Sequence, residues 1–257
     1  MVEKGSKNPN LFTLYGNGFC FYDMNLITKM GVHYSLYLKT LERLGTTPLH
    51  DYYYRRACKY EDFGCFALTE LMHGSNVKGM MTEAHYDHSS KELVIHSPSK
   101  DAIKFWIGGA AKTSNMTIVW AQLYIRDHCH GVHAIVVPLR DQETHKVLPG
   151  ITIGDCGPKF GLNGVDNGFI EFNRFRVPVG NLLNRVSGVD EKGEFFSKAS
   201  SEGKRFGTTL AALSEGRLFM CCHSSTSALC ALAIAIRYTF ARKQFTNGKG
   251  QKENYLF

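Results

Sequence analysis

The chain has 257 residues, 44% of them hydrophobic and 12% aromatic, which is enough apolar surface to bury a core, so we expect a folded globular protein. Lys and Arg outnumber Asp and Glu by 30 to 23, and the net charge of +7 favours anionic partners such as nucleotides. The charges form no long runs, and this scattered pattern argues against binding to nucleic acid.

Helical-length stretches fill the first part of the chain. Residues Leu11 to Leu44 mix aromatic and polar residues between two turn-forming segments, Gly16-Asn17-Gly18 and Gly45-Thr46-Thr47-Pro48. We therefore predict a small helical segment and assign residues 1–62 to a partial N-terminal helical domain.

The pattern changes to short β-rich runs from about Phe63 to Pro178. In the last run Ile170 and Phe172 alternate with polar residues, which predicts that one face is buried. Short strands joined by turn residues that adopt left-handed conformations indicate an antiparallel sandwich or barrel, and we assign residues 63–185 to this middle β-domain. The runs are Leu93 to His96, Thr117 to Ile125, Val132 to Leu139 and Phe169 to Val177, and the turns are Asp87 to Ser90, Asp127 to Gly131 and Asp166 to Gly168.

A long Ala/Leu/Ser pattern from about Phe206 to Phe245 follows a polar stretch. Its apolar residues recur at intervals of three and four, which places Leu229, Leu232, Ile236 and Phe240 on one helical face. We predict a long helix and assign residues 186–257 to the start of a C-terminal helical domain, which is incomplete. The fold class is therefore α+β, with a central antiparallel β-barrel or sandwich flanked by helical segments.

Several kinds of site are not supported by the sequence. The eight cysteines are irregularly spaced without a Cys-x-x-Cys pair, and the chain begins without a signal-peptide pattern, so we expect reduced thiols inside a cell. The longest apolar run, Ala228 to Ile236, has nine residues, and we expect no membrane span. His128, Cys129, His130 and His133 fall where side chains alternate in direction, so we predict no metal site. Fingerprints of dinucleotide-binding folds, phosphate loops and serine hydrolases are absent from the sequence.

Two segments have the chemistry to hold a flat polar ring. The first, Phe66 to Asn76, exposes backbone amides and the Thr69 hydroxyl around a glycine that permits close approach. The second, Lys104 to Ala111, presents Trp106 for stacking next to Gly108, which admits a polar edge. Taken alone, the first segment is equally an ordinary strand-to-loop turn, and Trp106 is equally a core residue.

Together these segments resemble the flavin-facing motifs of the acyl-CoA oxidase family, and the likeness covers nearly the whole chain. The resemblance implies an acyl-CoA dehydrogenase-type fold, whose middle β-domain lies between helical domains and shares FAD with the helical bundle behind it. It thus implies that residues 63–185 are the flavin-binding domain. It also implies acyl-CoA as substrate and a homodimer with a shared FAD site. The other stretches that carry it are Leu14 to Gly18, Lys29 to His33, Gly131 to Ala134, Val137 to Arg140, Leu148 to Ile151 and Gly161 to Gly168.

The resemblance assigns cofactor and substrate roles to residues of the two segments. Thr69 takes the family's contact to the flavin ring, and Gly108, beside Trp106, takes the matching contact from the Trp-Ile-x motif. Ser75 corresponds to the position beside the acyl-pantetheine chain.

A further motif lies at the end of the long helical pattern. Arg242-Lys243-Gln244-Phe245 is similar to the family's Arg-x-Gln-Phe motif, which implies that Arg242 and Gln244 reach the FAD of a neighbouring subunit. A guanidinium there suits a pyrophosphate bidentately. From the residues alone, Arg242 is also explained as a helix-end cation that complements the helix dipole.

By resemblance the reaction converts acyl-CoA and dioxygen to trans-2-enoyl-CoA and hydrogen peroxide in fatty acid β-oxidation. The family's catalytic glutamate lies beyond the position of Phe257, so we assign no catalytic residue in this chain and expect a fragment or a truncated family member. Met72 and Thr246 depart from the usual family residues, and residues 37–41 replace what is often a Gly-rich turn.

Two other functions remain open at this point. The chain is alternatively a catalytically inactive relative that serves as a binding or assembly subunit, or an electron-transferring acyl-CoA dehydrogenase. Peroxisomal residence is implied by the resemblance alone, since Tyr255-Leu256-Phe257 is not a peroxisomal targeting tripeptide.

Overall fold

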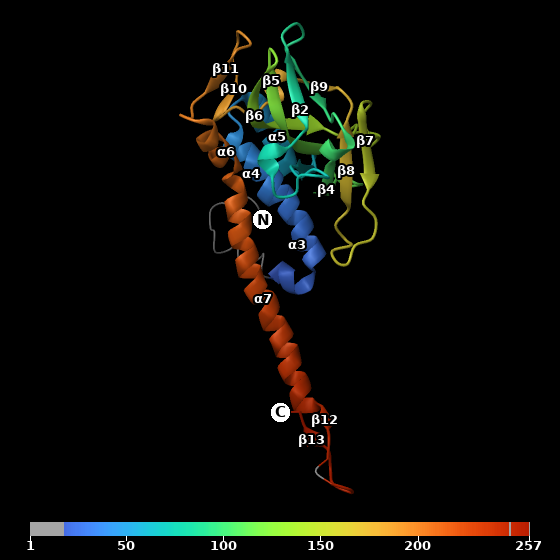
Figure 1. The fold of residues 1–257 in the computed structure, drawn as a ribbon. Helices are drawn as coiled ribbons and strands as arrows, with labels where there is room; N and C mark the ends of the chain where they lie inside the picture. Colours follow the sequence, from blue (N-terminus) through green and yellow to red (C-terminus); the bar gives the residue numbers. More distant parts are fainter. Residues whose placement is uncertain (1–17, 247, 257) are drawn as a thin grey trace. The chain divides into compact units, whose positions relative to one another are not determined.

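The computed structural model describes residues 18–246 and 248–256 (Figure 1). These residues form two compact units, which are described separately. The larger unit spans Asn25–Gly216, and the smaller one combines residues 18–24 with 217–246 and 248–256. The domain boundaries at residues 62 and 185 stay predictions.

The larger unit begins with helices. The helix α3 (Met24–Gly31) continues into a π-helical stretch, η1 (Val32–Leu38), and then into α4 (Lys39–Leu44). The prediction of a helical segment up to Leu44 is thereby confirmed from residue 18 onward, and Leu11 to Asn17 lie outside the described residues.

A further helix, α5 (Pro48–Cys58), was not singled out from the sequence. Thr47 caps it, since its side-chain oxygen accepts from the His50 backbone N–H at 3.3 Å while His50 Nδ1 accepts from the Thr47 N–H at 3.3 Å. Pro48 occupies the first turn, where its missing N–H costs nothing. The pair Thr47-Pro48 in the sequence indicates a helix start, although His50 stands where a capping box usually has Glu or Gln.

The centre of the unit is a six-stranded sheet built around one long strand. Strand β5 (Met116–Ile125) pairs along one edge with β6 (His128–Pro138), and along the other edge first with β1 (Gly64–Ala67) and then with β2 (Glu83–Asp87). Strands β3 (Glu92–His96) and β9 (Phe175–Pro178) continue the sheet beyond β2.

A second, three-stranded sheet has the order β4 (Lys104–Gly108), β8 (Asn167–Phe172), β7 (Ile151–Asp155). The remaining elements of the unit are the hairpin β10 (Ser187–Val189) and β11 (Phe195–Ser197), the 3₁₀ turns η2 (Val77–Gly79), η3 (Lys100–Ala102) and η4 (Val179–Asn181), and the helix α6 (Glu202–Leu210).

Two apolar cores lie on opposite faces of the large sheet, because successive residues of β5 point to opposite sides. Ile118 and Trp120 pack with Tyr37 and Leu41 of the helices. Val119, Ala121 and Leu123 belong to the other core, which includes Ile107, Ile170 and Phe172 of the three-stranded sheet. Helices therefore cover one face of the large sheet and the small sheet covers the other (Figure 1).

The α+β class is confirmed, but the sheet is mixed rather than purely antiparallel. Strands β1 and β2 both run parallel to β5. The expectation of antiparallel pairing rested on short connections between neighbouring strands. Parallel neighbours need long crossovers, and Ala67 is separated from Met116 by a stretch that contains β2, β3 and β4.

The run from Phe169 to Val177, predicted as one strand, is two strands in different sheets. The chain turns at Asn173 and Arg174, and Arg174 has a φ of 51°, which ends β8 before β9 begins. The predicted turn from Asp166 to Gly168 is also wrong, because Asn167 and Gly168 already belong to β8. The predicted turn from Asp87 to Ser90 connects β2 to β3, as expected. Of the predicted turn from Asp127 to Gly131, only Asp127 lies between β5 and β6, because His128 to Gly131 already belong to β6.

The predicted long helix is divided. Residue Ala211 separates α6 from α7 (Ala212–Ala241), and Lys243–Gln244 form the strand β12, which pairs with β13 (Asn254–Tyr255) in the smaller unit. Helix α7 therefore ends four residues before Phe245. Leu229, Leu232, Ile236 and Phe240 are exposed in the described structure.

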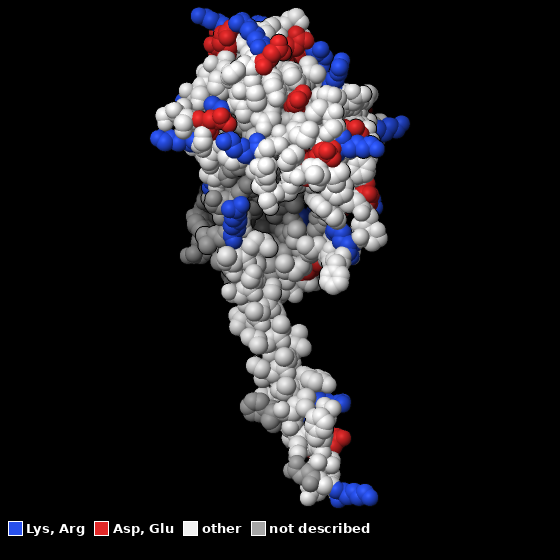
Figure 2. All heavy atoms as spheres, viewed as in Figure 1, with Lys and Arg blue, Asp and Glu red and all other residues white. Residues whose placement is uncertain are grey.

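The side chains of both charge signs are intermingled over the face of the larger unit that Figure 2 shows. No helix in residues 18–246 or 248–256 is long and apolar enough to cross a membrane. The seven cysteines whose side chains are described are free thiols.

Candidate functional site

The two segments predicted to hold a planar ring lie side by side. The backbone N–H of Phe105 donates to the Thr69 carbonyl at 3.0 Å, and the Thr69 hydroxyl donates to the Phe105 carbonyl at 2.7 Å. Glu70 and Lys104 form an antiparallel bridge next to this pair. The strand end that carries Thr69 is thus joined directly to β4, which carries Trp106 and Gly108.

The loop after Thr69 is organised around the Glu70 carboxylate. The Lys104 ammonium lies 3.0 Å from Glu70 Oε1, and both side chains are fully buried. The Thr82 N–H and hydroxyl donate to the same oxygen at 2.8 and 2.6 Å. The Met81 N–H donates to Oε2 at 2.8 Å, and His73 Nδ1 lies 2.9 Å from Oε2. One carboxylate therefore closes the loop from both ends.

The charges of this pair are set by opposing effects. Burial alone raises the pKa of Glu70, but the Lys104 ammonium and the hydrogen bonds from Thr82 and Met81 outweigh it and hold this pKa below its ordinary value. Burial lowers the pKa of Lys104, and the nearby carboxylate opposes that shift. The pair is ionised near neutral pH.

Trp106 has a backbone conformation that is rare for an aromatic residue. Its φ of 64° lies in the left-handed region, and its side chain is 54% exposed. The pairing of β4 with β8 shifts by one residue between Lys104 and Ile107, so Phe105 and Trp106 together lie opposite the single residue Phe169. This β-bulge turns the ring of Trp106 outward.

Gly108 lies under close packing. A Cβ atom at this position would stand 3.1 Å from Val32 Cγ2 and 3.4 Å from Val165 Cγ1, so a side chain would displace helix-side or loop neighbours. The exposed ring of Trp106 and the bare backbone of Gly108 follow one another along the same strand end.

The other predicted residues lie elsewhere. Ser75 is exposed in the loop that begins at Thr69, and its carbonyl accepts from the Val77 N–H at 3.0 Å. Arg242 and Gln244 belong to the smaller unit, where Arg242 follows α7 and Gln244 pairs with Asn254 in β12 and β13. The grouping of Arg242 and Gln244 with the Thr69 loop stays a prediction.

Sequence reasoning missed Glu70 and Lys104. Each was quoted only as part of a motif, although each is a charged residue inside an apolar stretch that continues a buried strand. A charge in such a place is rarely buried unless it is paired, and two opposite charges in two segments already expected to meet were the available signal.

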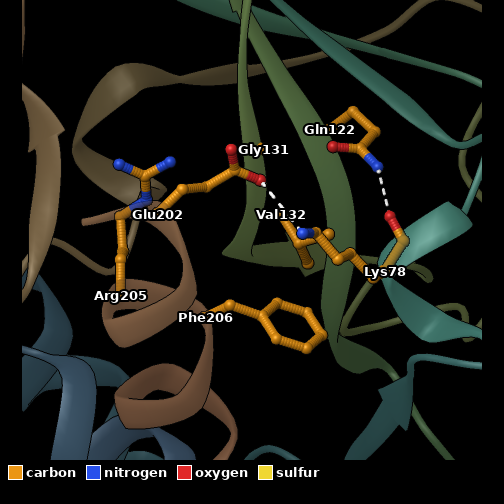
Figure 3. Close-up of a pocket in the computed structure, with 7 residues that line it drawn as sticks. All are labelled: Lys78, Gln122, Gly131, Val132, Glu202, Arg205 and Phe206. Carbon is orange, nitrogen blue, oxygen red and sulfur yellow. Dashed lines mark hydrogen bonds and ion pairs between the residues drawn. The ribbon is translucent and has the colours of Figure 1, made fainter.

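Three cavities in the larger unit lie away from this surface, since none of them is lined by Thr69, Trp106 or Gly108. The one between α6 and strands β5 and β6 has a volume of about 10 Å³, room for one water molecule at most (Figure 3). Two open hollows of about 380 and 290 Å³ are lined by Leu41 to Tyr54 with Arg185, and by residues around Met80, Tyr124 and Cys129. The described residues contain no group of three side chains suited to hold a metal ion.

Comparison with known proteins supports a flavoprotein fold. Residues 65–175 match the family of the acyl-CoA dehydrogenase middle domain. A curated relative, "Acyl-coenzyme A oxidase 3, peroxisomal" of Arabidopsis thaliana, is 43% identical over 225 residues, which are 88% of this chain and 33% of the relative.

Two solved structures are similar as well. Acyl-CoA oxidase 3 from Yarrowia lipolytica superposes with a TM-score of 0.89 at 34% identity, covering 99% of this chain and 37% of that one. Acyl-CoA oxidase-2 of Caenorhabditis elegans, bound with FAD, ascaroside-CoA and ATP, has a TM-score of 0.82 at 34% identity, covering 89% of this chain and 34% of that one. The chain thus spans about a third of the length of these relatives.

Proposed function

Because this chain belongs to the acyl-CoA oxidase family, we propose that it forms the flavin-binding part of an FAD-dependent acyl-CoA oxidase of fatty acid β-oxidation. The reaction of such an enzyme converts acyl-CoA and dioxygen to trans-2-enoyl-CoA and hydrogen peroxide. The observation that carries the proposal is the direct hydrogen bonding between the Thr69 segment and strand β4, which brings a hydroxyl next to a strand that carries an exposed tryptophan and a glycine.

The residues of this surface suit a flavin. Trp106 offers an aromatic face for stacking, since its side chain is 54% exposed. The Thr69 hydroxyl donates its proton to the Phe105 carbonyl, so the lone pairs of its oxygen are suited to accept a hydrogen bond from a ring N–H. Gly108 is only partly buried, and in this proposal its backbone meets the polar edge of the ring. The net charge of +7 favours an anionic dinucleotide.

In this proposal the bound FAD supplies the acceptor for the electron pair that leaves the acyl chain. The chain's own residues bind and orient. Glu70 and Lys104 hold the Thr69 loop against β4, and Ser75, further along that loop, lies beside the acyl-pantetheine chain of the substrate. We assign the base that removes the α-proton to no residue of this chain.

The proposed assembly is a homodimer with a shared FAD site in the peroxisome, the compartment named for the Arabidopsis relative. Arg242 and Gln244 would serve the FAD of the neighbouring copy. Apolar residues on α7 support self-association, because Leu229, Leu232, Ile236 and Phe240 are exposed together, and contiguous exposed apolar side chains are typical of interaction sites.

The decisive experiment loads the purified chain with FAD, records its visible spectrum after gel filtration, and assays peroxide with a series of acyl-CoA thioesters. Retained flavin with peroxide formation supports the proposal. Retained flavin without turnover favours a binding or assembly subunit. Flavin that acyl-CoA reduces, and that an acceptor dye reoxidises far faster than dioxygen does, favours a dehydrogenase. A chain that retains no FAD contradicts all three.

A further inference from the structure

The start of β8 contacts the backbone of the Trp106 strand at several points. The Asn167 side-chain amide donates to the Trp106 carbonyl at 3.0 Å, and the backbone of Asn167 pairs with Gly108 across the two strands. Asn167 Nδ2 also lies 3.9 Å from where a Cβ of Gly108 would stand. One side chain thus lies beside both residues that are proposed to meet the flavin.

The conformation that Asn167 contacts is a costly one. A left-handed φ for a residue other than glycine costs about 1 to 3 kcal/mol and persists only where surrounding contacts impose it. Trp106 has a φ of 64° and is 54% exposed. The hydrogen bond from Asn167 acts directly on the peptide that follows Trp106.

The neighbouring residue Asp166 binds the turn that follows β4. Its carboxylate accepts from the N–H groups of Lys112 and Thr113 at 2.9 and 2.8 Å and from the Thr113 hydroxyl at 2.9 Å. Its carbonyl accepts from the Gly109 N–H at 2.9 Å, and Lys29 of α3 pairs with its carboxylate at 2.9 Å. The backbone of Asn167 is therefore held in place relative to β4, the strand that its side chain contacts.

We infer that Asn167 is a positioning residue of the flavin surface: its amide holds the Trp106 peptide so that the aromatic ring and the Gly108 backbone face the same ligand. This inference rests on the proposed function, because it concerns how the same surface receives FAD. Asn167 belongs to the motif from Gly161 to Gly168, which is part of the family resemblance, and the inference gives this motif a role in positioning Trp106.

The test uses two variants and a matched control in the full 257-residue chain. Asn167→Asp replaces the donor by an oxygen that repels the Trp106 carbonyl, and Asn167→Ala removes the donor without adding charge. Asn163→Asp is the control, since Asn163 lies in the loop just before β8 and its Nδ2 donates at the same distance of 3.0 Å to the Lys159 carbonyl instead of to Trp106.

The first measurement needs no cofactor. The chain has two tryptophans, and Trp120 is only 1% exposed, so acrylamide quenching of tryptophan fluorescence reports mainly on Trp106. Both Asn167 variants are expected to shift the emission maximum and the quenching constant, and Asn163→Asp is expected to match wild type.

The second measurement is FAD binding followed by flavin fluorescence and visible absorption. Both Asn167 variants should bind FAD about fivefold more weakly, the effect of one lost hydrogen bond, with altered flavin bands. A wild-type chain that binds no FAD overturns the proposed function. Wild-type binding, together with Asn167 variants whose tryptophan fluorescence, FAD affinity and flavin bands equal those of wild type, overturns the role of Asn167 alone, even if their melting temperatures fall.

Discussion

Glu70 and Lys104 are the residues on which the candidate site depends most directly. Their charges are buried completely, and the carboxylate accepts hydrogen bonds from the backbone of Met81 and Thr82 as well. Moving two charges out of water is costly, and the pair persists because nearly every lone pair and proton has a partner. Removing one member leaves the other charged and unpaired in an apolar setting.

We predict that Glu70→Gln lowers the free energy of unfolding by about 3 to 5 kcal/mol, because a buried Lys104 ammonium loses its counter-charge. Urea denaturation measures the effect. Lys104→Met combined with Glu70→Gln should recover part of the loss, since the stranded cation is then gone.

Glu83→Gln is the control for this pair. Glu83 bonds His85 at 2.8 Å on the partly exposed side of β2, so its loss should change stability by less than about 0.5 kcal/mol. A Glu70→Gln variant as stable as this control would show that the buried pair does not hold the loop.

Thr69 is expected to act on the flavin through its hydroxyl. We predict that Thr69→Val shifts the visible absorption bands of bound FAD, while Thr69→Ser, which keeps a hydroxyl within reach of the Phe105 carbonyl, retains the wild-type bands. Equal spectra for Val and wild type would remove Thr69 from the site.

At the scale of elements, the end of α7 carries the second part of the proposed cofactor site. The helix stops at Ala241, and the chain then turns into the short hairpin of β12 and β13. The Leu256 N–H donates to the Arg242 carbonyl at 3.1 Å, so the backbone at Arg242 is held by the hairpin while its side chain is exposed. An exposed guanidinium on a fixed backbone suits a phosphate of a second molecule.

We predict that Arg242→Ala weakens FAD retention about tenfold in the assembled dimer, the scale of one charge-assisted hydrogen bond. Arg237→Ala changes an exposed arginine in the last turns of α7, and this matched control should leave retention unchanged. Equilibrium dialysis with FAD measures both. Equal loss in the two variants would indicate a general effect of charge rather than a shared site.

At the scale of the larger unit, β6 joins the central sheet to the β10–β11 hairpin through a buried histidine. His133 Nδ1 donates to the Gly131 carbonyl at 2.9 Å, and Nε2 accepts from the Ser187 hydroxyl at 2.8 Å, which describes a neutral ring. Burial lowers the pKa of His133 to about 4, and the nearby Arg205 and His130 act in the same direction.

This shift makes stability depend on pH. The unfolded chain binds a proton at His133 below about pH 6.5, whereas the folded chain does so only below about pH 4, so stability rises with pH between these values and falls on acidification. We predict that wild type loses about 2 to 3 kcal/mol more than His133→Asn between about pH 7 and pH 4.5. Urea denaturation of both proteins at the two pH values measures the difference, and equal losses would contradict the assignment.

Much of the local structure was predictable from the sequence. The alternation in β8 and the apolar runs of β3, β5 and β6 identified strands, and the spacing of Leu229, Leu232, Ile236 and Phe240 identified a helix. The two segments that meet at the candidate site were also found, because their hydroxyl, aromatic and glycine residues resemble one family. These signals are local, since periodicity reports which side of a single element is buried.

Only the tertiary structure decided which strands pair and which residues of the site are held in an energetically unfavourable state. The parallel pairing of β1 and β2 with β5, the division of residues 169–177 between two sheets, and the left-handed Trp106 all depend on contacts between residues far apart in the chain. The burial of Glu70 with Lys104 is of the same kind, because each charge is tolerable only when the other is present. A sequence pattern indicates the conformation and burial that each residue favours locally. These features exist because contacts with distant residues compensate for conformations and burial that are unfavourable locally.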